Sequence, residues 1–512
     1  MTHRRIVIVG GGTAGWMTAA YLSRTLGQNS PTGVMVTLIE SPDISIIGVG
    51  EGSFPTLRTT LQTLGVTEAA FCKGADATFK QGVRFTGWAG RPTPGHVDDD
   101  YMHVFELPYG GDAPGLLPAW LATGGAKRPP YADAVSAQEQ VMRAGRAPKR
   151  PGDPDYSAPF SYAYHFDAGK LANFLRDTAV ANGVEHIRAT IGDIIRADDG
   201  DIAAVVPIGG GAPIAGDLFV DCTGFSARLI GETMGSRFTP LDDVLFNDRA
   251  LALQIPYDRP DAPIPSYTHA TAHDGGWIWD IGLSERRGTG CVYSSRHCSD
   301  DEAERTLRAY AGPAAKDLPV RQLKFRTGYR ETQWVGNCVA IGLAAGFFEP
   351  LESTGIMLIE VAARMLAELA VEGDRDAMAA AARLYNRTMP ARFAAIVEFL
   401  KLHYAISHRR DSAYWRDNTD PVSWPDGLKD KLAQWRHRPP SRFDFVIDHE
   451  SFLPPNWQYI LYGHGFETAP PPVSEAALQA AYRDFATVRN AQQQAVAALP
   501  SHRSLVDHLH HS

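Results

Sequence analysis

The residues best suited to chemistry form a glycine turn near the N-terminus. Gly10, Gly12 and Gly15 follow the apolar run 6–9 in the spacing G-x-G-x-x-G. The first glycine of such a turn permits a tight bend, the second lets the backbone approach a pyrophosphate, and the third lets helix and strand pack closely. Glu40 ends the next β-rich run, where a carboxylate can accept hydrogen bonds from an adenosine ribose. The pattern predicts one dinucleotide site, with structural turn glycines as the alternative.

Strand and helix patterns surround this turn. Residues 6–9 and 34–39 have the composition of buried strands and 13–26 that of a helix, so the first fifty residues predict a βαβ unit. Further helices are expected at 166–181, 356–371, 374–385 and 475–499, and a β-rich section at 245–330. The last residues, 502–512, hold four histidines and are expected to form a frayed polar tail rather than a metal site.

The composition excludes several classes of protein. With 512 residues, 44% of them hydrophobic, the chain is too apolar to be disordered, and its length suggests two modules or one interleaved fold. A net charge of −9 argues against nucleic acid as the main partner. The five cysteines form no C-x-x-C pair, which favours buried thiols in a reducing compartment. We find neither a membrane-spanning stretch nor a secretory signal, and expect a cytoplasmic protein.

Six longer segments carry a family resemblance. They are VGGGTAGWMTAAYL, IGVGEGSFP, DATFKQGVRFTGW, DLFVDCTGFSARLI, GGWIWDIGL and WVGNCVAIGLAAGFFEPLESTGI. In order and spacing they resemble the flavin-dependent halogenases of the tryptophan halogenase family. The signature W-x-W-x-I-P is matched at Trp277, Trp279 and Ile281, but Gly282 stands in place of its proline.

The resemblance implies an α/β fold, in which a Rossmann-like FAD-binding module of the flavin monooxygenase type is interleaved with a β-sheet and a mostly helical C-terminal substrate module. It implies a single interleaved fold over 1–512. The FAD-binding segments are expected at about 1–90, 160–235 and 325–372, and the substrate-side segments at about 91–159, 240–325 and 373–512. The flavin contacts that the resemblance implies are Gly10, Gly12, Thr13, Ala14, Gly15, Glu40, Val49, Gly50, Gly342 and Leu343.

The resemblance also implies the reaction. Reduced FAD and oxygen would oxidise chloride or bromide to hypohalous acid, with the halide held at the backbone of Thr354 and Gly355. Lys80 would capture the hypohalous acid, as an ammonium or as a neutral amine that forms a haloamine, and Glu352 would orient it and take the ring proton. From the residues alone, Lys80 is more typical of a surface lysine whose stem lies on apolar neighbours, and Glu352 is more typical of a carboxylate at a helix start.

The resemblance also implies roles on the substrate side for two pairs of ring-bearing residues. Trp277 and Trp279 alternate, so on a strand they share a face and would keep an organic substrate from the flavin. His103 and Phe105 stand where the family stacks an indole. Core packing is the alternative for both pairs. The stretch SFLPPNWQYILYGHGF differs from the segment by which tryptophan halogenases hold the amino acid, so an indole or another electron-rich aromatic is as good a candidate as free tryptophan.

The sequence holds only one dinucleotide fingerprint, so a separate NADH-dependent flavin reductase would supply reduced FAD. The resemblance implies a homodimer. We expect no metal site. An FAD-dependent aromatic monooxygenase is the second candidate, but its usual Gly-Asp pair is here Gly342-Leu343. A non-catalytic flavin-binding protein is the third.

Overall fold

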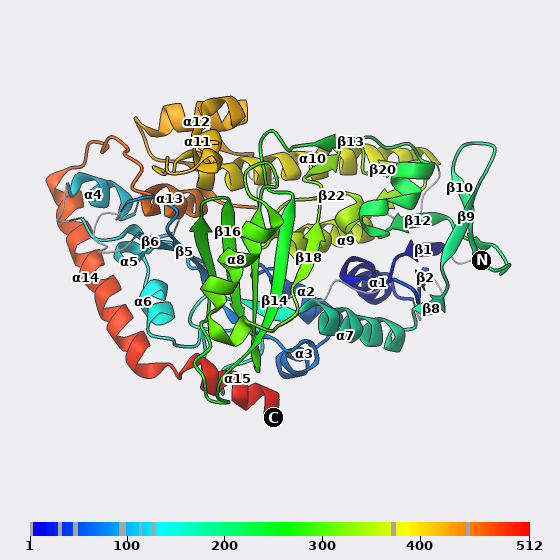
Figure 1. Ribbon diagram of the computed structural model, residues 1–512, viewed down its shortest axis with the longest axis horizontal. Helices are drawn as coiled ribbons and strands as arrows, with labels where there is room; N and C mark the ends of the chain where they lie inside the picture. Colours follow the sequence, from blue (N-terminus) through cyan, green and yellow to red (C-terminus); the bar gives the residue numbers. More distant parts are fainter. Residues whose placement is uncertain are drawn as a thin grey trace. The chain divides into compact units, whose positions relative to one another are not determined.

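Figure 1 shows the helices and strands of the computed structural model. The chain divides into two compact units, each built from three segments. The first unit comprises Met1–Ala77, Phe166–Pro240 and Phe325–Phe393, and the second comprises Thr78–His165, Leu241–Lys324 and Ala394–Ser512. The structure describes residues 4–28, 33–44, 50–91, 99–111, 115–124, 128–369, 375–446 and 451–511.

The first unit contains a six-stranded sheet in the order β20-β21-β12-β1-β2-β8. Its strands are β1 (Arg5–Val9), β2 (Met35–Glu40), β8 (Glu185–Arg188), β12 (Leu218–Asp221), β20 (Trp334–Val335) and β21 (Cys338–Ala340). All neighbours are parallel except β20 and β21. A parallel sheet buries both faces, which explains the continuous apolar run in β1. The β1–α1–β2 unit predicted from the sequence is confirmed.

Helices and small sheets complete the first unit. The helices are α1 (Thr13–Thr25), α2 (Leu57–Leu64), α3 (Glu68–Ala75), α7 (Ala168–Ala181) and α9 (Thr354–Leu369). The additional strands are β3 (Gly50–Gly52), β9 (Ile191–Arg196), β10 (Ile202–Pro207), β11 (Ile214–Ala215), β13 (Phe238–Pro240), β19 (Gly328–Arg330) and β22 (Gly346–Phe347). Helix α1 packs against α7 and α9, so the glycine turn and the start of α9 belong to one packed body.

The second unit is built on a seven-stranded sheet in the order β18-β14-β17-β16-β15-β5-β6. Its strands are β5 (Gly82–Thr86), β6 (Asp100–Val104), β14 (Arg249–Pro256), β15 (Thr268–His273), β16 (Gly276–Gly282), β17 (Arg286–Tyr293) and β18 (Arg321–Lys324). Only β15 and β5 run parallel. A separate short strand, β4 (Thr78–Lys80), pairs antiparallel with β7 (Ala163–Asp167).

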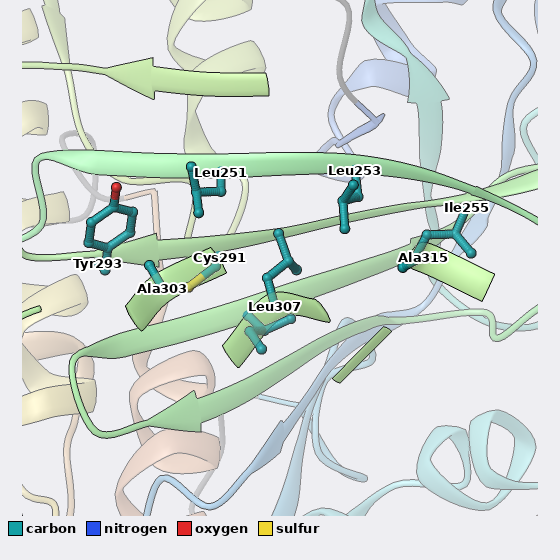
Figure 2. Close-up of a cluster of buried hydrophobic side chains, with 9 residues drawn as sticks. Leu251, Leu253, Ile255, Cys291, Tyr293, Ala303, Leu307 and Ala315 are labelled. Carbon is teal, nitrogen blue, oxygen red and sulfur yellow. The ribbon is translucent and has the colours of Figure 1, made fainter. Parts of the chain in front are cut away.

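Helix α8 (Asp300–Ala311) covers one face of this sheet. Ala303 and Leu307 of the helix lie in a buried cluster with side chains of β14, β16 and β17, among them Leu251 and Tyr293 (Figure 2). Ser299 and Glu302 form a capping box that starts the helix. The β-rich section expected at 245–330 is therefore interrupted by one helix.

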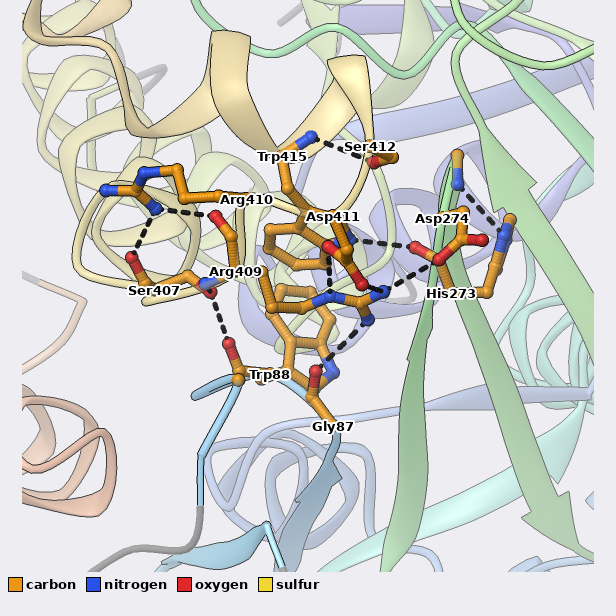
Figure 3. A network of polar contacts seen from close by, with 12 residues as sticks. Gly87, Trp88, His273, Asp274, Ser407, Arg409, Arg410, Asp411, Ser412 and Trp415 are labelled. Atoms are coloured by element: carbon orange, nitrogen blue, oxygen red, sulfur yellow. Dashed lines mark hydrogen bonds and ion pairs between the residues drawn. The ribbon is translucent and has the colours of Figure 1, made fainter.

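The remaining helices of the second unit come mainly from the C-terminal part. They are α4 (Leu117–Ala122), α5 (Tyr131–Val135), α6 (Gln138–Arg143), α11 (Ala413–Thr419), α12 (Asp426–Trp435), α13 (Pro454–Gly463), α14 (Glu475–Ala498) and α15 (His502–His511). Arg409 ties the segment before α11 to the sheet (Figure 3). Its guanidinium donates to Gly87 O and Asp274 and lies over the Trp415 ring, 4.8 Å from the centroid.

Two elements differ from the sequence-based expectation. The helix predicted to end at Tyr385 is part of α10 (Arg375–Ala405), which continues through Pro390. The frayed tail expected at 502–512 is wrong for 502–511, because these residues form α15 with Leu505 and Val506 buried. No helix among the described residues is long and apolar enough to cross a membrane.

Candidate active site

In the first unit, the glycine turn combines close backbone packing with open space at the start of α1. A Cβ on Gly10, whose φ is +118°, would lie 2.1 Å from Cys222 O, and a Cβ on Gly15 would lie 1.8 Å from Gly10 O. Both positions therefore require glycine for close backbone packing. A Cβ on Gly12 would meet no atom within 4 Å, and no side chain caps the start of α1. Open space before uncapped N–H groups fits a pyrophosphate.

Two further predicted flavin contacts lie beside this turn. A Cβ built on Gly342, at φ +72°, would come within 2.6 Å of the Ala14 Cβ, so the segment that carries Gly342 and Leu343 adjoins the first turn of α1. Thr13, the first residue of α1, belongs to that turn. The structure thus brings together residues that are more than 300 positions apart in the sequence.

Glu40 stands at the carboxyl end of β2, as predicted. Its side chain lies beside Gly11, and Oε2 is 3.0 Å from Nε2 of His186. His186 meets Trp16 edge-to-face at 4.8 Å between ring centroids. The sequence analysis missed His186, because no motif marks it and only the pairing of β2 with β8 brings it to Glu40.

The strap segment is described from Gly50 onward. Gly50 is buried at the start of β3, whereas Val49 lies outside the described residues. Glu51 follows Gly50 in β3. Burial, and to a lesser degree the charge of Asp167, raises the pKa of its carboxyl to about 7. This carboxyl was not predicted, since its titration depends on burial that the sequence does not show.

The start of α9 carries the predicted carboxylate and halide residues. Glu352 and Ser353 both have positive φ, 68° and 59°, immediately before Thr354 begins the helix. Two successive left-handed residues that are not glycine store conformational strain. The Glu352 and Thr354 side chains are buried, and a Cβ on Gly355 would meet no atom within 4 Å. Glu352 precedes the helix start, as the alternative of a carboxylate at a helix start requires, and its catalytic role stays a prediction.

In the second unit, Lys80 is completely buried at the end of β4, so the alternative of a surface lysine is wrong. Its Nζ lies 5.3 Å from the centroid of the Phe105 ring. His165 is paired with Thr78 on the neighbouring strand, and its Nε2 lies 2.8 Å from Thr268 Oγ1. Burial, followed by the charge of Lys80, lowers the pKa of His165 well below its usual value. The lysine therefore lies near a neutral imidazole.

His103 and Phe105 lie on the substrate side of the prediction. His103 is buried in β6, with its ring 6.0 Å from Tyr459 and 5.9 Å from Phe399. Phe105 follows the end of the strand, and its N–H donates to Gln81 O. Asn456 Nδ2 donates to His103 Nε2 at 2.9 Å. The sequence analysis missed Asn456, which belongs to the C-terminal stretch that departs from the family.

Trp277 and Trp279 share one face of β16, as predicted, with ring centroids 6.5 Å apart. Trp277 packs against Trp88 at 6.2 Å, and Trp279 lies over Gly290, where a Cβ would meet the indole at 2.1 Å. The pair is therefore packed into the second unit. This packing agrees with a core role and does not decide the barrier role.

Comparison with known proteins gives a consistent result. The sequence profile of the family described as tryptophan halogenase matches residues 5–479. Tryptophan 6-halogenase SttH of Streptomyces toxytricini is 37% identical over 97% of this chain and 96% of its own length. The crystal structure of a tryptophan halogenase from Shewanella frigidimarina superposes with a TM-score of 0.94 at 41% identity, covering 99% of this chain and 98% of that one.

A third similar protein is described as flavin-dependent. Tar14, described as a tryptophan C-6 flavin-dependent halogenase (chlorinase) from taromycin biosynthesis, superposes with a TM-score of 0.91 at 34% identity, covering 99% of each chain. These matches extend over nearly the whole chain. The chain therefore belongs to the tryptophan halogenase family, whose members are flavin-dependent enzymes.

Proposed function

We propose that the chain is a two-component halogenase that uses reduced FAD, oxygen and chloride or bromide to halogenate an electron-rich aromatic such as an indole. A separate NADH-dependent reductase supplies the reduced FAD, because the sequence holds one dinucleotide fingerprint. Family membership supports the reaction class. The observation that carries the proposal is the complete burial of Lys80 beside the Phe105 ring, since lysine is rarely fully buried and removing an ammonium from water costs several kcal/mol.

The first unit is proposed to bind FAD. Gly12, Thr13 and Ala14 would present N–H groups to the pyrophosphate, with Glu40 toward the ribose and Gly342 and Leu343 toward the flavin. The open space at Gly12 and the close packing at Gly10 and Gly15 support this assignment. Bound reduced FAD would supply the two electrons that reduce oxygen to the peroxide level, at which it can oxidise the halide to hypohalous acid.

The chain's own residues have four tasks in this proposal. The N–H groups of Thr354 and Gly355 hold the halide, where the N-terminal end of the α9 dipole favours an anion. Lys80 holds the hypohalous acid. Glu352 orients it and accepts the ring proton after the halogen has added to an aromatic carbon. His103 and Phe105 stack on the substrate in the second unit.

The amino-acid substrate of the named relatives makes tryptophan the first compound to test here. The test combines the protein with FAD, a reductase, NADH, oxygen and bromide over tryptophan, indoles and phenols, with mass spectrometry reading the bromine isotope pair. Brominated product supports the proposal. Hydroxylated product that forms without halide would replace it with the monooxygenase alternative.

A matched pair of variants tests Lys80. Lys80→Ala is expected to abolish bromination and leave the affinity for oxidised FAD unchanged. Lys401→Ala is the control, because Lys401 is also completely buried over an aromatic ring, 4.7 Å from the Phe246 centroid, and bonds to Asn418. Undiminished product from Lys80→Ala would refute the role of this lysine.

A further inference from the structure

We propose that His502, the first residue of α15, is a positioning residue for Lys80, and that the C-terminal helix is therefore part of the halogenating machinery. The inference rests on the proposed function of Lys80. It assigns a task to the segment whose sequence predicts only a polar tail.

The contact that carries the inference is a hydrogen bond to the strand of the lysine. The N–H of Phe79 donates to His502 Nε2 at 3.0 Å, and Phe79 immediately precedes Lys80 in β4. The other ring nitrogen, Nδ1, lies 2.9 Å from Ile264 O. A carbonyl only accepts, so Nδ1 carries the proton and Nε2 is the acceptor. Both ring nitrogens of a neutral imidazole are thus used, and the ring orientation is fixed.

The surroundings keep His502 neutral and immobile. The residue is completely buried, and burial lowers the pKa of its imidazole to about 4. Its backbone N–H donates to Gly145 O, and the neighbouring Arg503 donates to Ala262 O and Ser284 O. The first turn of α15 is therefore tied to three other segments of the second unit.

Strand β4 has only three residues, and the His502 bond adds to the hydrogen bond from Thr78 to Gly282 O and to the Tyr162 and Tyr164 rings that pack on Phe79. One edge pairs with β7, where Phe79 faces Tyr164 and Lys80 faces Ala163. Phe79 and Lys80 point to opposite faces of the strand. A shift of the Phe79 backbone would therefore move the Lys80 Cα and its ammonium. Since a misplacement of about 1 Å can cost on the order of 100-fold in rate, loss of the His502 bond is expected to lower the rate even where the other contacts of β4 remain.

The test compares three variants of the full-length protein. His502→Leu removes the acceptor and keeps an apolar side chain, whereas the oxygen of His502→Gln can accept from the Phe79 N–H. His508→Leu makes the same change at an exposed position of the same helix. Each is assayed for tryptophan or indole bromination with FAD, reductase, NADH, bromide and catalase. Phenol red traps free hypobromous acid as bromophenol blue.

The expected result is a specific loss. His502→Leu should lower kcat at least about tenfold with KM and FAD affinity unchanged, while the ratio of trapped hypobromous acid to brominated product rises, because the acid still forms but is not held. His502→Gln should recover most of kcat, and His508→Leu should equal wild type. A His502→Leu variant with wild-type kcat, or one that loses product with no rise in the trapped acid, would overturn the inference.

A second measurement needs no turnover. Acylation of Lys80 by an amine reagent, followed by peptide mass spectrometry, reports its burial in the protein without FAD. His502→Leu should label Lys80 faster than wild type, and His502→Gln should not; equal labelling in all variants contradicts the inference, even where His502→Leu is too unstable to assay. If wild type labels slowly but halogenates nothing, the proposed function fails and the positioning of Lys80 still stands.

Discussion

The hydroxyl of Thr78 donates a hydrogen bond to the carbonyl oxygen of Gly282 at 2.6 Å. Thr78 begins the strand that carries Lys80, and Gly282 ends the strand that carries Trp277 and Trp279. Gly282 also stands where the family signature has proline. The departure from the signature therefore lies at a direct link between the lysine strand and the tryptophan strand.

Substitution of Gly282 should destabilise the second unit. A Cβ at this position would lie 2.7 Å from Ile264 Cγ2 and 3.0 Å from the Tyr257 hydroxyl, so Gly282→Ala, and more so Gly282→Pro, should cost about 1–3 kcal/mol through overpacking. Urea denaturation measures the loss. Gly152→Ala is the control, because a Cβ there meets no atom within 4 Å. Equal stability of the Gly282 and Gly152 variants would show that Ile264 and Tyr257 move aside without cost.

Alanine substitution should affect stability at one glycine of the N-terminal turn and FAD affinity at another. Gly15→Ala should destabilise the fold by about 1–3 kcal/mol, because its Cβ would lie 1.8 Å from Gly10 O. Gly12→Ala should leave stability within about 0.5 kcal/mol and weaken FAD binding at least about tenfold, since its Cβ would enter the space assigned to the pyrophosphate. Thermal unfolding and FAD titration separate the two effects. Unchanged FAD affinity in Gly12→Ala would argue against a pyrophosphate at this position.

Glu352 and Glu349 offer a direct test of which carboxylate acts. Glu352→Gln keeps the size of the side chain and removes its basicity, so bromination should fall by about 100-fold or more with FAD affinity unchanged. Glu349→Gln is the matched control, because Glu349 is likewise buried three residues earlier. Rates measured at saturating bromide distinguish them. Loss of activity in Glu349→Gln alone would transfer the general-base role to Glu349.

Glu360 should make stability fall with pH. Burial raises the pKa of this carboxyl to about 7, and it accepts hydrogen bonds from Thr56 and Thr60. The folded state thus keeps a proton on Glu360 that the unfolded state loses above about pH 4.5. The stabilising contribution of Glu360 to the free energy of unfolding is therefore complete below that pH and disappears as pH rises through 7.

The corresponding variant is Glu360→Gln, which cannot titrate. The stability of wild type minus that of Glu360→Gln should decrease between pH 5 and pH 8 by up to about 3 kcal/mol. Urea denaturation at each pH measures this difference in stability. The subtraction cancels the contributions of Glu51 and Glu139, whose pKa values are also raised to about 7, because both proteins contain them. The exposed Glu368 of the same helix provides a control in Glu368→Gln. A difference independent of pH would contradict the prediction.

The local features of this protein follow from its sequence alone. The spacing of Gly10, Gly12 and Gly15 predicted the strand–turn–helix unit, and the alternation of Trp277 and Trp279 predicted their shared face. These features depend on residues close together in the chain, whose periodicity follows from backbone geometry alone. The family resemblance covered the same motifs.

Which distant residues meet, and which side chains lose contact with water, depends on the tertiary structure. It buried Lys80, raised the pKa of Glu360, and placed His502 on the amide of Phe79, 423 positions earlier. The C-terminal helix was not predicted, because its histidines and charged residues resemble a solvated tail. Only the folded structure shows that Leu505 and Val506 are buried. Burial and long-range hydrogen bonds are properties of the packed chain, and local composition does not encode them.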